Sequence, residues 1–145
     1  MTTPHDALIL QTANVYGVPF DLLQSQVIQE SSGDPWAFRF EPAYFSKYIK
    51  SNTDAKGHEY GPLSACSFGL LQILLETALE IGYEGRPERL FEPKIGLAWG
   101  TKYLAQCIAR EGGDTWKGLA RYNGNGPRAM AYADQVYARA GRVRT

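Results

Sequence analysis

Apolar residues recur at helical spacing along most of the chain, and the alternating pattern of half-buried strands is scarce. This periodicity predicts a mainly α-helical domain. We expect helices over about residues 4–16, 21–32, 74–81, 93–111, 115–122 and 127–140. Asp21 is the expected N-cap of the second of these helices, and Gly33 with the Asp-Pro pair that follows is its expected stop.

The stretch between Arg39 and Cys66 is less regular than the rest of the chain. Residues 41–50 are expected to form a further helix with an aromatic and apolar side, whereas residues 51–65 are expected to form a long polar loop. Long loops in compact domains often form lids or the walls of binding sites. We therefore expect an insertion at about residues 39–66 to bear on ligand binding.

Length and composition fit one compact domain, residues 1–145. The chain is 44% hydrophobic and 21% charged, which is typical of a folded globular protein. Its 15 basic and 15 acidic residues cancel, which argues against a nucleic-acid partner and favours a neutral one. No apolar window is long enough for a membrane span, and no segment has the pattern of a signal peptide. We expect a monomer.

The sequence contains no recognisable metal or cofactor motif. Cys66 and Cys107 lie too far apart for a redox or zinc pattern, and two free thiols are expected because no export signal points to an oxidising compartment. Residues 124–129 follow the GxGxxA pattern of dinucleotide-binding proteins, but no strand precedes them. We therefore expect neither a metal nor a cofactor.

Glu30 continues the apolar stripe formed by Leu23 and Val27 on the second expected helix. A glutamate on a core-facing stripe is partly desolvated, which disfavours its charged form and suits it to donate a proton near neutral pH. The alternative is a structural glutamate that caps a neighbouring segment or pairs with Arg39 or Arg121. The stripe alone does not decide between the two.

Four stretches of the chain resemble, in order, the motif set of a known family. They are QESSGDPWA at residues 29–37, SFGLLQI at 67–73, LFEPKIGLAWGTKYL at 90–104 and ARYNGNG at 120–126. The set is similar to that of the soluble lytic transglycosylase catalytic domain, the SLT domain, which has a goose-type lysozyme-like fold. The resemblance extends over about residues 6–137 and implies a helical lysozyme-like domain.

The resemblance also implies roles for individual residues. It implies that Glu30 is the single catalytic acid and base and that Tyr122 is catalytic, and it implies as substrate-binding residues Ser31, Gly69, Leu70, Gln72, Asn123 and Tyr132. In the family's pattern the glutamine amide can bind an N-acetyl sugar. The alternative for Ser31 is a helix-end hydroxyl that satisfies the backbone.

The chain departs from the family's pattern at several places. Leu71 stands where methionine is usual, and Arg121 where a small or apolar residue is usual. The stretch from residue 39 to residue 66 is longer than usual, which puts one wall of the saccharide groove in doubt. Within it, Glu41 lies among aromatic residues, a composition that suits a sugar cleft. Glu41 could equally cap the helix that follows.

We therefore predict an enzyme, a peptidoglycan lytic transglycosylase that cleaves the MurNAc-β-1,4-GlcNAc bond and forms 1,6-anhydro-MurNAc. One alternative is a hydrolytic muramidase, a lysozyme, that uses water and a second carboxylate such as Glu41. Another is a peptidoglycan-binding or assembly module without catalysis. Because peptidoglycan lies outside the cytoplasmic membrane, we expect a phage lysis or virion-associated protein, or an enzyme delivered by a secretion system.

Overall fold

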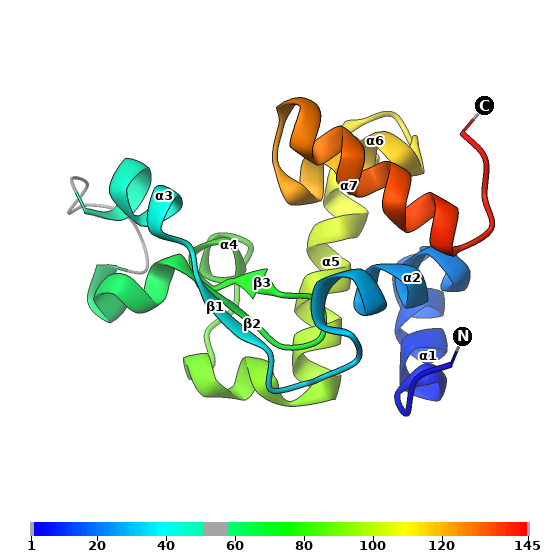
Figure 1. Ribbon diagram of the computed structural model, residues 1–145. Helices are drawn as coiled ribbons and strands as arrows, with labels where there is room; N and C mark the ends of the chain where they lie inside the picture. The colour runs from blue at the N-terminus through cyan, green and yellow to red at the C-terminus, as the bar shows by residue number, and fades with distance from the viewer. Residues whose placement is uncertain (1, 51–57, 145) are drawn as a thin grey trace. The chain divides into compact units, whose positions relative to one another are not determined.

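The computed structural model describes residues 2–50 and 58–144. The chain divides into two compact units. The first unit comprises Met1–Gly33 and Thr101–Thr145, and the second comprises Asp34–Gly100. Helix α5, Pro93–Arg110, supplies residues to both units. Figure 1 labels the helices and strands in chain order.

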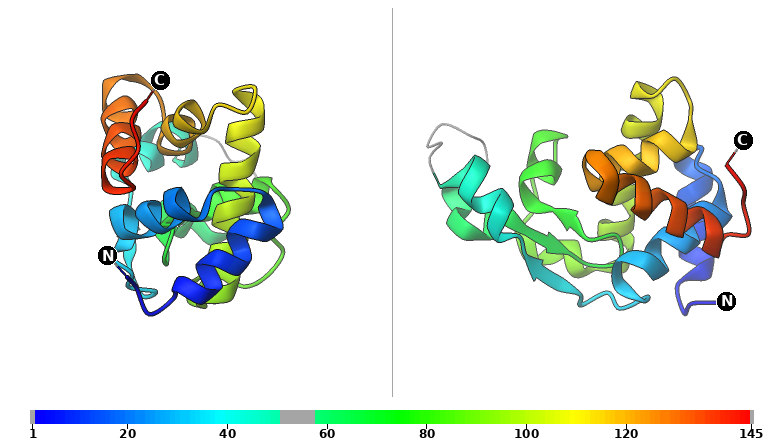
Figure 2. Two further views of the ribbon diagram at one scale, coloured as in Figure 1. Left: turned by 90° about the vertical axis from the view of Figure 1, so that its right-hand side faces the viewer. Right: turned by 45° about the horizontal axis from the view of Figure 1, so that its top comes forward.

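Four helices and the C-terminal part of α5 build the first unit. The four are α1 (Asp6–Tyr16), α2 (Phe20–Ser31), α6 (Thr115–Asn123) and α7 (Gly126–Arg139). Helix α2 packs against α1 and α7, and α6 packs against α7, as Figure 2 shows from two further sides. Leu23 and Val27 of α2 and Val136 of α7 are fully buried in this core. The apolar stripe predicted for the second helix is confirmed.

Helix α2 begins one residue earlier than expected. Pro19 occupies the N-cap position, and Asp21 lies in the first turn, so the prediction that Asp21 is the N-cap was wrong. The carboxylate of Asp21 instead accepts two hydrogen bonds from Arg142, at 2.6 and 3.0 Å. The helix ends at Ser31 because Ser32 takes a left-handed conformation with φ of 54°, one residue before the expected glycine.

A small antiparallel sheet lies in the second unit, in the order β1-β2-β3. Its strands are β1 (Phe38–Phe40), β2 (Cys66–Phe68) and β3 (Ile73–Leu74). Phe68 is opposite both Phe38 and Ile73. The sequence analysis did not predict these strands, because two or three residues are too few to show an alternating pattern. Helix α4 (Leu75–Glu80) packs against β2 and β3. It begins one residue later than expected.

The long segment of the second unit is only partly helical. The helix expected over residues 41–50 consists of α3 (Pro42–Tyr44) followed by the π-helical turn η1 (Phe45–Ile49). Of the loop expected over residues 51–65, residues 51–57 lie outside the described residues. The remainder forms the 3-10 segment η2 (His58–Ala65), which is interrupted at Gly61, and a second 3-10 segment, η3 (Pro87–Phe91), precedes α5.

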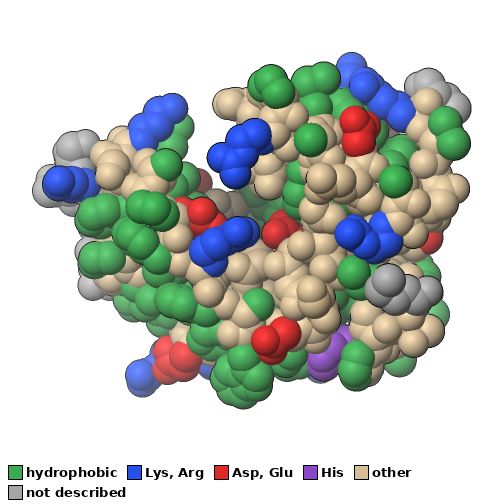
Figure 3. Space-filling view, viewed as in Figure 1, with side chains coloured by type: hydrophobic (Ala, Val, Ile, Leu, Met, Phe, Trp, Pro, Cys, Tyr) green, Lys and Arg blue, Asp and Glu red, His purple; other side chains and the backbone are tan. Residues whose placement is uncertain are grey.

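Aromatic residues before and along β1 are exposed. Trp36, Phe38 and Phe40 are 72%, 50% and 40% exposed, and hydrophobic side chains gather over this strand (Figure 3). Trp36 therefore does not belong to the core, although its ring lies 5.5 Å from that of Phe91. Among the helices of the described residues, none combines the length and apolar character that crossing a membrane requires.

Candidate active site

Glu30 is the penultimate residue of α2 and is half-buried. The buried stripe of Leu23 and Val27 anchors the helix on the same face, so the glutamate is held by regular secondary structure. The left-handed Ser32 then turns the chain away from the helix axis. The carboxylate therefore lies at the end of a packed helix, on its partly desolvated side.

Tyr132 of α7 contacts Glu30 directly. Its hydroxyl donates a hydrogen bond of 2.7 Å to Oε2 of Glu30, and the tyrosine is only 7% exposed. Burial, and after it the negative charge of Glu30, raises the pKa of Tyr132 well above its ordinary value. Tyr132 therefore remains a neutral hydrogen-bond donor to the carboxylate throughout the pH range in which proteins usually work.

Tyr122 lies close to the same carboxylate from a third helix. It is the penultimate residue of α6, and its ring lies 5.2 Å from that of Tyr103. Burial and then the charge of Glu30 raise the pKa of Tyr122 well above its ordinary value. The first unit thus brings Glu30, Tyr122 and Tyr132 together, while Asn123 lies exposed at the end of α6 beside Tyr122.

Ser31 satisfies the end of its own helix. Its hydroxyl donates to the carbonyl of Val27 at 3.0 Å and accepts from the amide of Gly33 at 3.2 Å. These contacts are those of a helix-end hydroxyl that pairs backbone groups, the alternative that the sequence left open. A role of Ser31 in substrate binding stays a prediction.

The predicted residues of the second unit lie in the turn between β2 and β3. Gly69 has φ of +76°, and a Cβ there would lie 2.7 Å from the carbonyl oxygen of Leu90, so both the conformation and the close approach require glycine. Leu70 is 1% exposed and belongs to the core, so its side chain presents no surface to a ligand. The turn is therefore rigidly packed at its first two positions.

Gln72 holds this turn through its side chain. Its amide nitrogen donates to the carbonyl oxygens of Ala37 and Gly69, at 2.9 and 3.0 Å. Both N–H groups of the amide are thereby used. In the described part of the chain its amide oxygen accepts no hydrogen bond, so Gln72 offers a ligand an acceptor and not a donor.

Glu41 and Arg121, two further charged residues of the sequence analysis, have charged partners. Glu41 lies at the N-cap position of α3 without a side-chain cap, and its Oε1 lies 3.0 Å from Nε of Arg39. Arg121 lies 3.7 Å from the carboxylate of Glu111. Glu41 is thus a carboxylate paired with arginine within the second unit, and its use as a catalytic base would require that pair to open.

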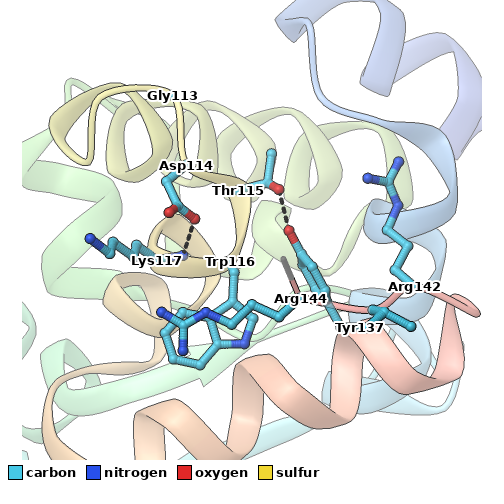
Figure 4. Close-up of a pocket in the computed structure, with 9 residues that line it drawn as sticks. Gly113, Asp114, Thr115, Trp116, Lys117, Tyr137, Arg142 and Arg144 are labelled. Carbon is cyan, nitrogen blue, oxygen red and sulfur yellow. Dashed lines mark hydrogen bonds between the residues drawn. The ribbon is translucent and has the colours of Figure 1, made fainter.

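A cavity of about 680 Å³ lies elsewhere in the first unit, at the start of α6 (Figure 4). It is lined by Trp116, over which the guanidinium of Arg144 stacks at 3.5 Å, and by Tyr137, whose hydroxyl lies 2.5 Å from that of Thr115. None of the predicted site residues lines it. Two C-terminal arginines are paired, Arg144 with the ring of Trp116 and Arg142 with the carboxylate of Asp21.

The described residues contain no cluster of three or more His, Cys, Asp or Glu side chains that could hold a metal ion. Cys66 and Cys107 are both buried free thiols, as predicted. Burial is the main reason that the pKa of each thiol is raised, which leaves them neutral and unreactive near pH 7.

One residue of this site escaped the sequence analysis. Gln26 is fully buried, and its amide nitrogen donates to the hydroxyl oxygen of Tyr132 at 3.1 Å. The signal was present in the sequence, since Gln26 is a polar residue on an otherwise apolar stripe, one helical turn before Glu30. Its partner, however, lies 106 residues away and cannot be read from local spacing.

The comparison with family models identifies the family, and the comparison with solved structures supports the fold. The model of the transglycosylase SLT domain family matches residues 7–144, so the chain belongs to that family. The structure is similar to that of an inactive glutamate-to-glutamine mutant of the lytic transglycosylase Slt from Pseudomonas aeruginosa, with 17% identity and a TM-score of 0.68. The likeness covers 94% of this chain and 23% of that chain, so this chain spans about a quarter of that protein. No curated protein matches the sequence.

These findings confirm two predictions made from the sequence, the SLT-domain family and a mainly helical fold that matches a lytic transglycosylase. Membership of this transglycosylase family also supports the prediction of an enzyme. The roles assigned to individual residues stay predictions.

Proposed function

We propose that this SLT-domain protein is a peptidoglycan lytic transglycosylase in which Glu30 serves as the single acid and base. The observation that carries the proposal is the position of Glu30, half-buried at the end of α2, with the hydroxyl of Tyr132 donating to its carboxylate at 2.7 Å. A carboxyl group held in this way can exchange a proton with a bound substrate in a fixed geometry. That the similar Slt structure is of an inactive glutamate-to-glutamine mutant supports a mechanism that depends on a glutamate carboxyl group.

In the proposed reaction, neutral Glu30 donates its proton to the oxygen of the β-1,4 bond between N-acetylmuramic acid and N-acetylglucosamine. The N-acetyl group of the substrate stabilises the positive charge that develops at C1 as the bond breaks. Glu30, now a carboxylate, accepts the proton of the C6 hydroxyl, whose oxygen closes on C1 as a 1,6-anhydro ring. The donated and accepted protons balance, and neither water nor a second carboxylate takes part.

Two tyrosines of the first unit supply polar groups around this chemistry, and Gln72 of the second unit is proposed separately as a substrate-binding residue. Tyr132 stabilises the carboxylate that forms after the first proton transfer, because it is held neutral and donates to Oε2. Tyr122, also held neutral, provides a second phenol close to Glu30. The free acceptor oxygen of Gln72 suits the N–H group of an N-acetyl sugar, because its own N–H groups are used by the backbone.

The alternative of a hydrolytic lysozyme requires a base to activate water. Glu41 is the candidate that the sequence offers, but its carboxylate is paired with Arg39 at 3.0 Å. This ion pair favours a structural role for Glu41. We further propose that the enzyme acts on the cell wall outside the cytoplasmic membrane, as a phage-encoded or secretion-system protein.

The test is the release of soluble fragments from purified peptidoglycan by the wild type, Glu30→Gln and Glu41→Gln. Glu30→Gln should lower the rate by about a hundred- to ten-thousandfold while the protein stays folded by circular dichroism, because an amide cannot cycle a proton. Glu41→Gln, the matched carboxyl-to-amide control, should retain activity. A folded Glu30→Gln protein that still degrades peptidoglycan would contradict the proposal.

A further inference from the structure

Gln26 is a buried polar residue that the mechanism above does not use. Its side chain is fully buried, and it lies one helical turn before Glu30 on the same face of α2. Its Nε2 donates to the hydroxyl oxygen of Tyr132 at 3.1 Å, whereas its Oε1 has no hydrogen-bond partner among the described residues. A buried carbonyl oxygen without a partner lowers the stability of the fold. A glutamine at this position is therefore explained better by a functional role than by a stabilising one.

The hydrogen bonds at Tyr132 determine where its hydroxyl proton points. A phenol has one proton to donate, and its oxygen can accept a hydrogen bond. Gln26 presents an N–H group, which cannot accept, so the proton of Tyr132 is directed to its other partner, Oε2 of Glu30. If Gln26 presented its carbonyl oxygen instead, the same proton could turn away from Glu30.

We propose that Gln26 is a positioning residue for the proton transfers of Glu30 and acts through the hydroxyl of Tyr132. The inference rests on the proposed function for the role of Glu30 itself. With the proton of Tyr132 directed at Oε2, the proton of the neutral acid is held on Oε1, the oxygen that exchanges it with the substrate. Once that proton has left, the same hydrogen bond stabilises the carboxylate.

Two tyrosines of the first unit interact with Glu30, and a third contacts one of them. Tyr132 on α7 and Tyr122 on α6 interact with it electrostatically, and Tyr103 on α5 contacts the ring of Tyr122. Burial raises the pKa of Tyr122 and of Tyr132 well above the ordinary value. Because both remain neutral near pH 7, the direction of the Tyr132 proton depends on hydrogen bonding and not on ionisation of these neighbours.

Gln26→Met tests the proposal while keeping the buried volume and the helical preference of the side chain. The variant removes the N–H donor together with the unpaired oxygen. It should lower kcat about three- to tenfold, which corresponds to the loss of one hydrogen bond. KM should stay unchanged, and the melting temperature should stay unchanged or rise. Gln24→Met is the matched control, because it makes the same change on the same helix. The side-chain amide of Gln24 donates to Asp6 at 3.1 Å, and its variant should behave as the wild type.

A double-mutant cycle separates positioning from a purely structural role. Because Gln26 acts through Tyr132, Gln26→Met should alter kcat by less than about twofold in a Tyr132→Phe protein. Additive losses in the double variant, or a Gln26→Met protein that loses stability while its kcat stays at the wild-type value, would overturn the proposal.

Carbon-13 NMR titration of the Glu30 carboxyl carbon provides a readout independent of activity, with the signal assigned by its loss in Glu30→Gln. Gln26→Met should raise the titration midpoint of Glu30 by up to about one unit, and the shift should vanish in the Tyr132→Phe background. An unchanged or lowered midpoint would refute the inference. A wild type that shows this coupling but does not cleave peptidoglycan would refute the proposed function alone.

Discussion

The hydroxyl of Tyr132 on α7 donates a 2.7 Å hydrogen bond to the carboxylate of Glu30 on α2, across 102 residues of sequence. A second polar contact joins the same two helices, in which Ser25 Oγ donates to the carbonyl of Val136 at 2.7 Å. Both helices contribute fully buried apolar side chains to the core of the first unit. The position of the carboxylate is therefore determined by the packing of two helices and not by a loop.

Tyr132→Phe should lower kcat about tenfold or more with little change in KM. The reason is that the Glu30 carboxylate loses a hydrogen bond from a buried donor, and bonds to charged groups contribute about 1.5–3 kcal/mol. Steady-state kinetics on purified peptidoglycan measure the effect. An unchanged kcat in a folded Tyr132→Phe protein would exclude Tyr132 from the proton-transfer chemistry.

The pH dependence of unfolding checks the environment of the same tyrosine. Because the pKa of Tyr132 is raised in the folded protein, its contribution to stability is complete below the ordinary pKa of about 10 and is lost as the pH rises above that value. The difference in unfolding free energy between wild type and Tyr132→Phe should therefore narrow above about pH 10 in urea denaturation. A difference that stays constant to higher pH would show that the tyrosine is not perturbed.

Tyr122→Phe should lower kcat more than it raises KM if its hydroxyl acts mainly on the transition state. Tyr137→Phe is the control, since Tyr137 pairs with Thr115 at the start of α6 and does not line the Glu30 site. The control should keep both kinetic parameters near wild type. A Tyr122→Phe protein that loses only affinity would assign the residue to ground-state binding.

Gly69→Ala should destabilise the protein far more than Gly112→Ala. Both glycines have positive φ, +76° and +67°, so each substitution incurs the cost of a left-handed alanine, about 1–2 kcal/mol. At Gly69 the added Cβ would also lie 2.7 Å from the backbone oxygen of Leu90, whereas nothing lies within 4 Å at Gly112. Chemical denaturation should show a loss of about 3 kcal/mol or more for Gly69→Ala. Equal losses would contradict the tight packing of this turn.

Arg142→Ala should remove a pH-dependent contribution to stability. Hydrogen bonds from Arg142 are the main reason that the pKa of Asp21 is lowered in the folded protein. The ion pair therefore stabilises the fold fully above the ordinary pKa of Asp21, and this stabilisation is lost as the pH falls through the lowered pKa. Because both side chains are more than a third exposed, the loss at pH 7 should be below about 1 kcal/mol. Urea denaturation at neutral and acidic pH, with Arg128→Ala as the control, measures it. A loss that persists in acid would assign the effect to packing.

Much of this architecture was predictable from local sequence, because helices of nine or more residues carry a clear periodicity. Helices α1, α5, α6 and α7 lie within two residues of their expected bounds. The sheet was not predictable, since Ser67 and its neighbours form strands of two or three residues whose pairing is tertiary. The N-terminus of α2 was not predictable either, because Asp21, the expected N-cap, forms an ion pair with Arg142, which is distant in the sequence.

The candidate site was predictable only as residues and not as contacts. The motifs indicated Glu30, Tyr122 and Tyr132, which the first unit brings together. They could not indicate that Leu70 is core or that the N–H groups of Gln72 serve the backbone, because these facts depend on how the turn packs. Gln26 was missed for the same reason, since its partner comes from α7.

The most direct test of the central claim is mass spectrometry of the soluble muropeptides released from purified peptidoglycan, before and after borohydride reduction. A single carboxylate that recycles its proton predicts products that are lighter than the hydrated species by one water and that resist reduction. Hydrated products with reducible ends would contradict the account, because water would then be the nucleophile and a second carboxylate such as Glu41 would have to activate it.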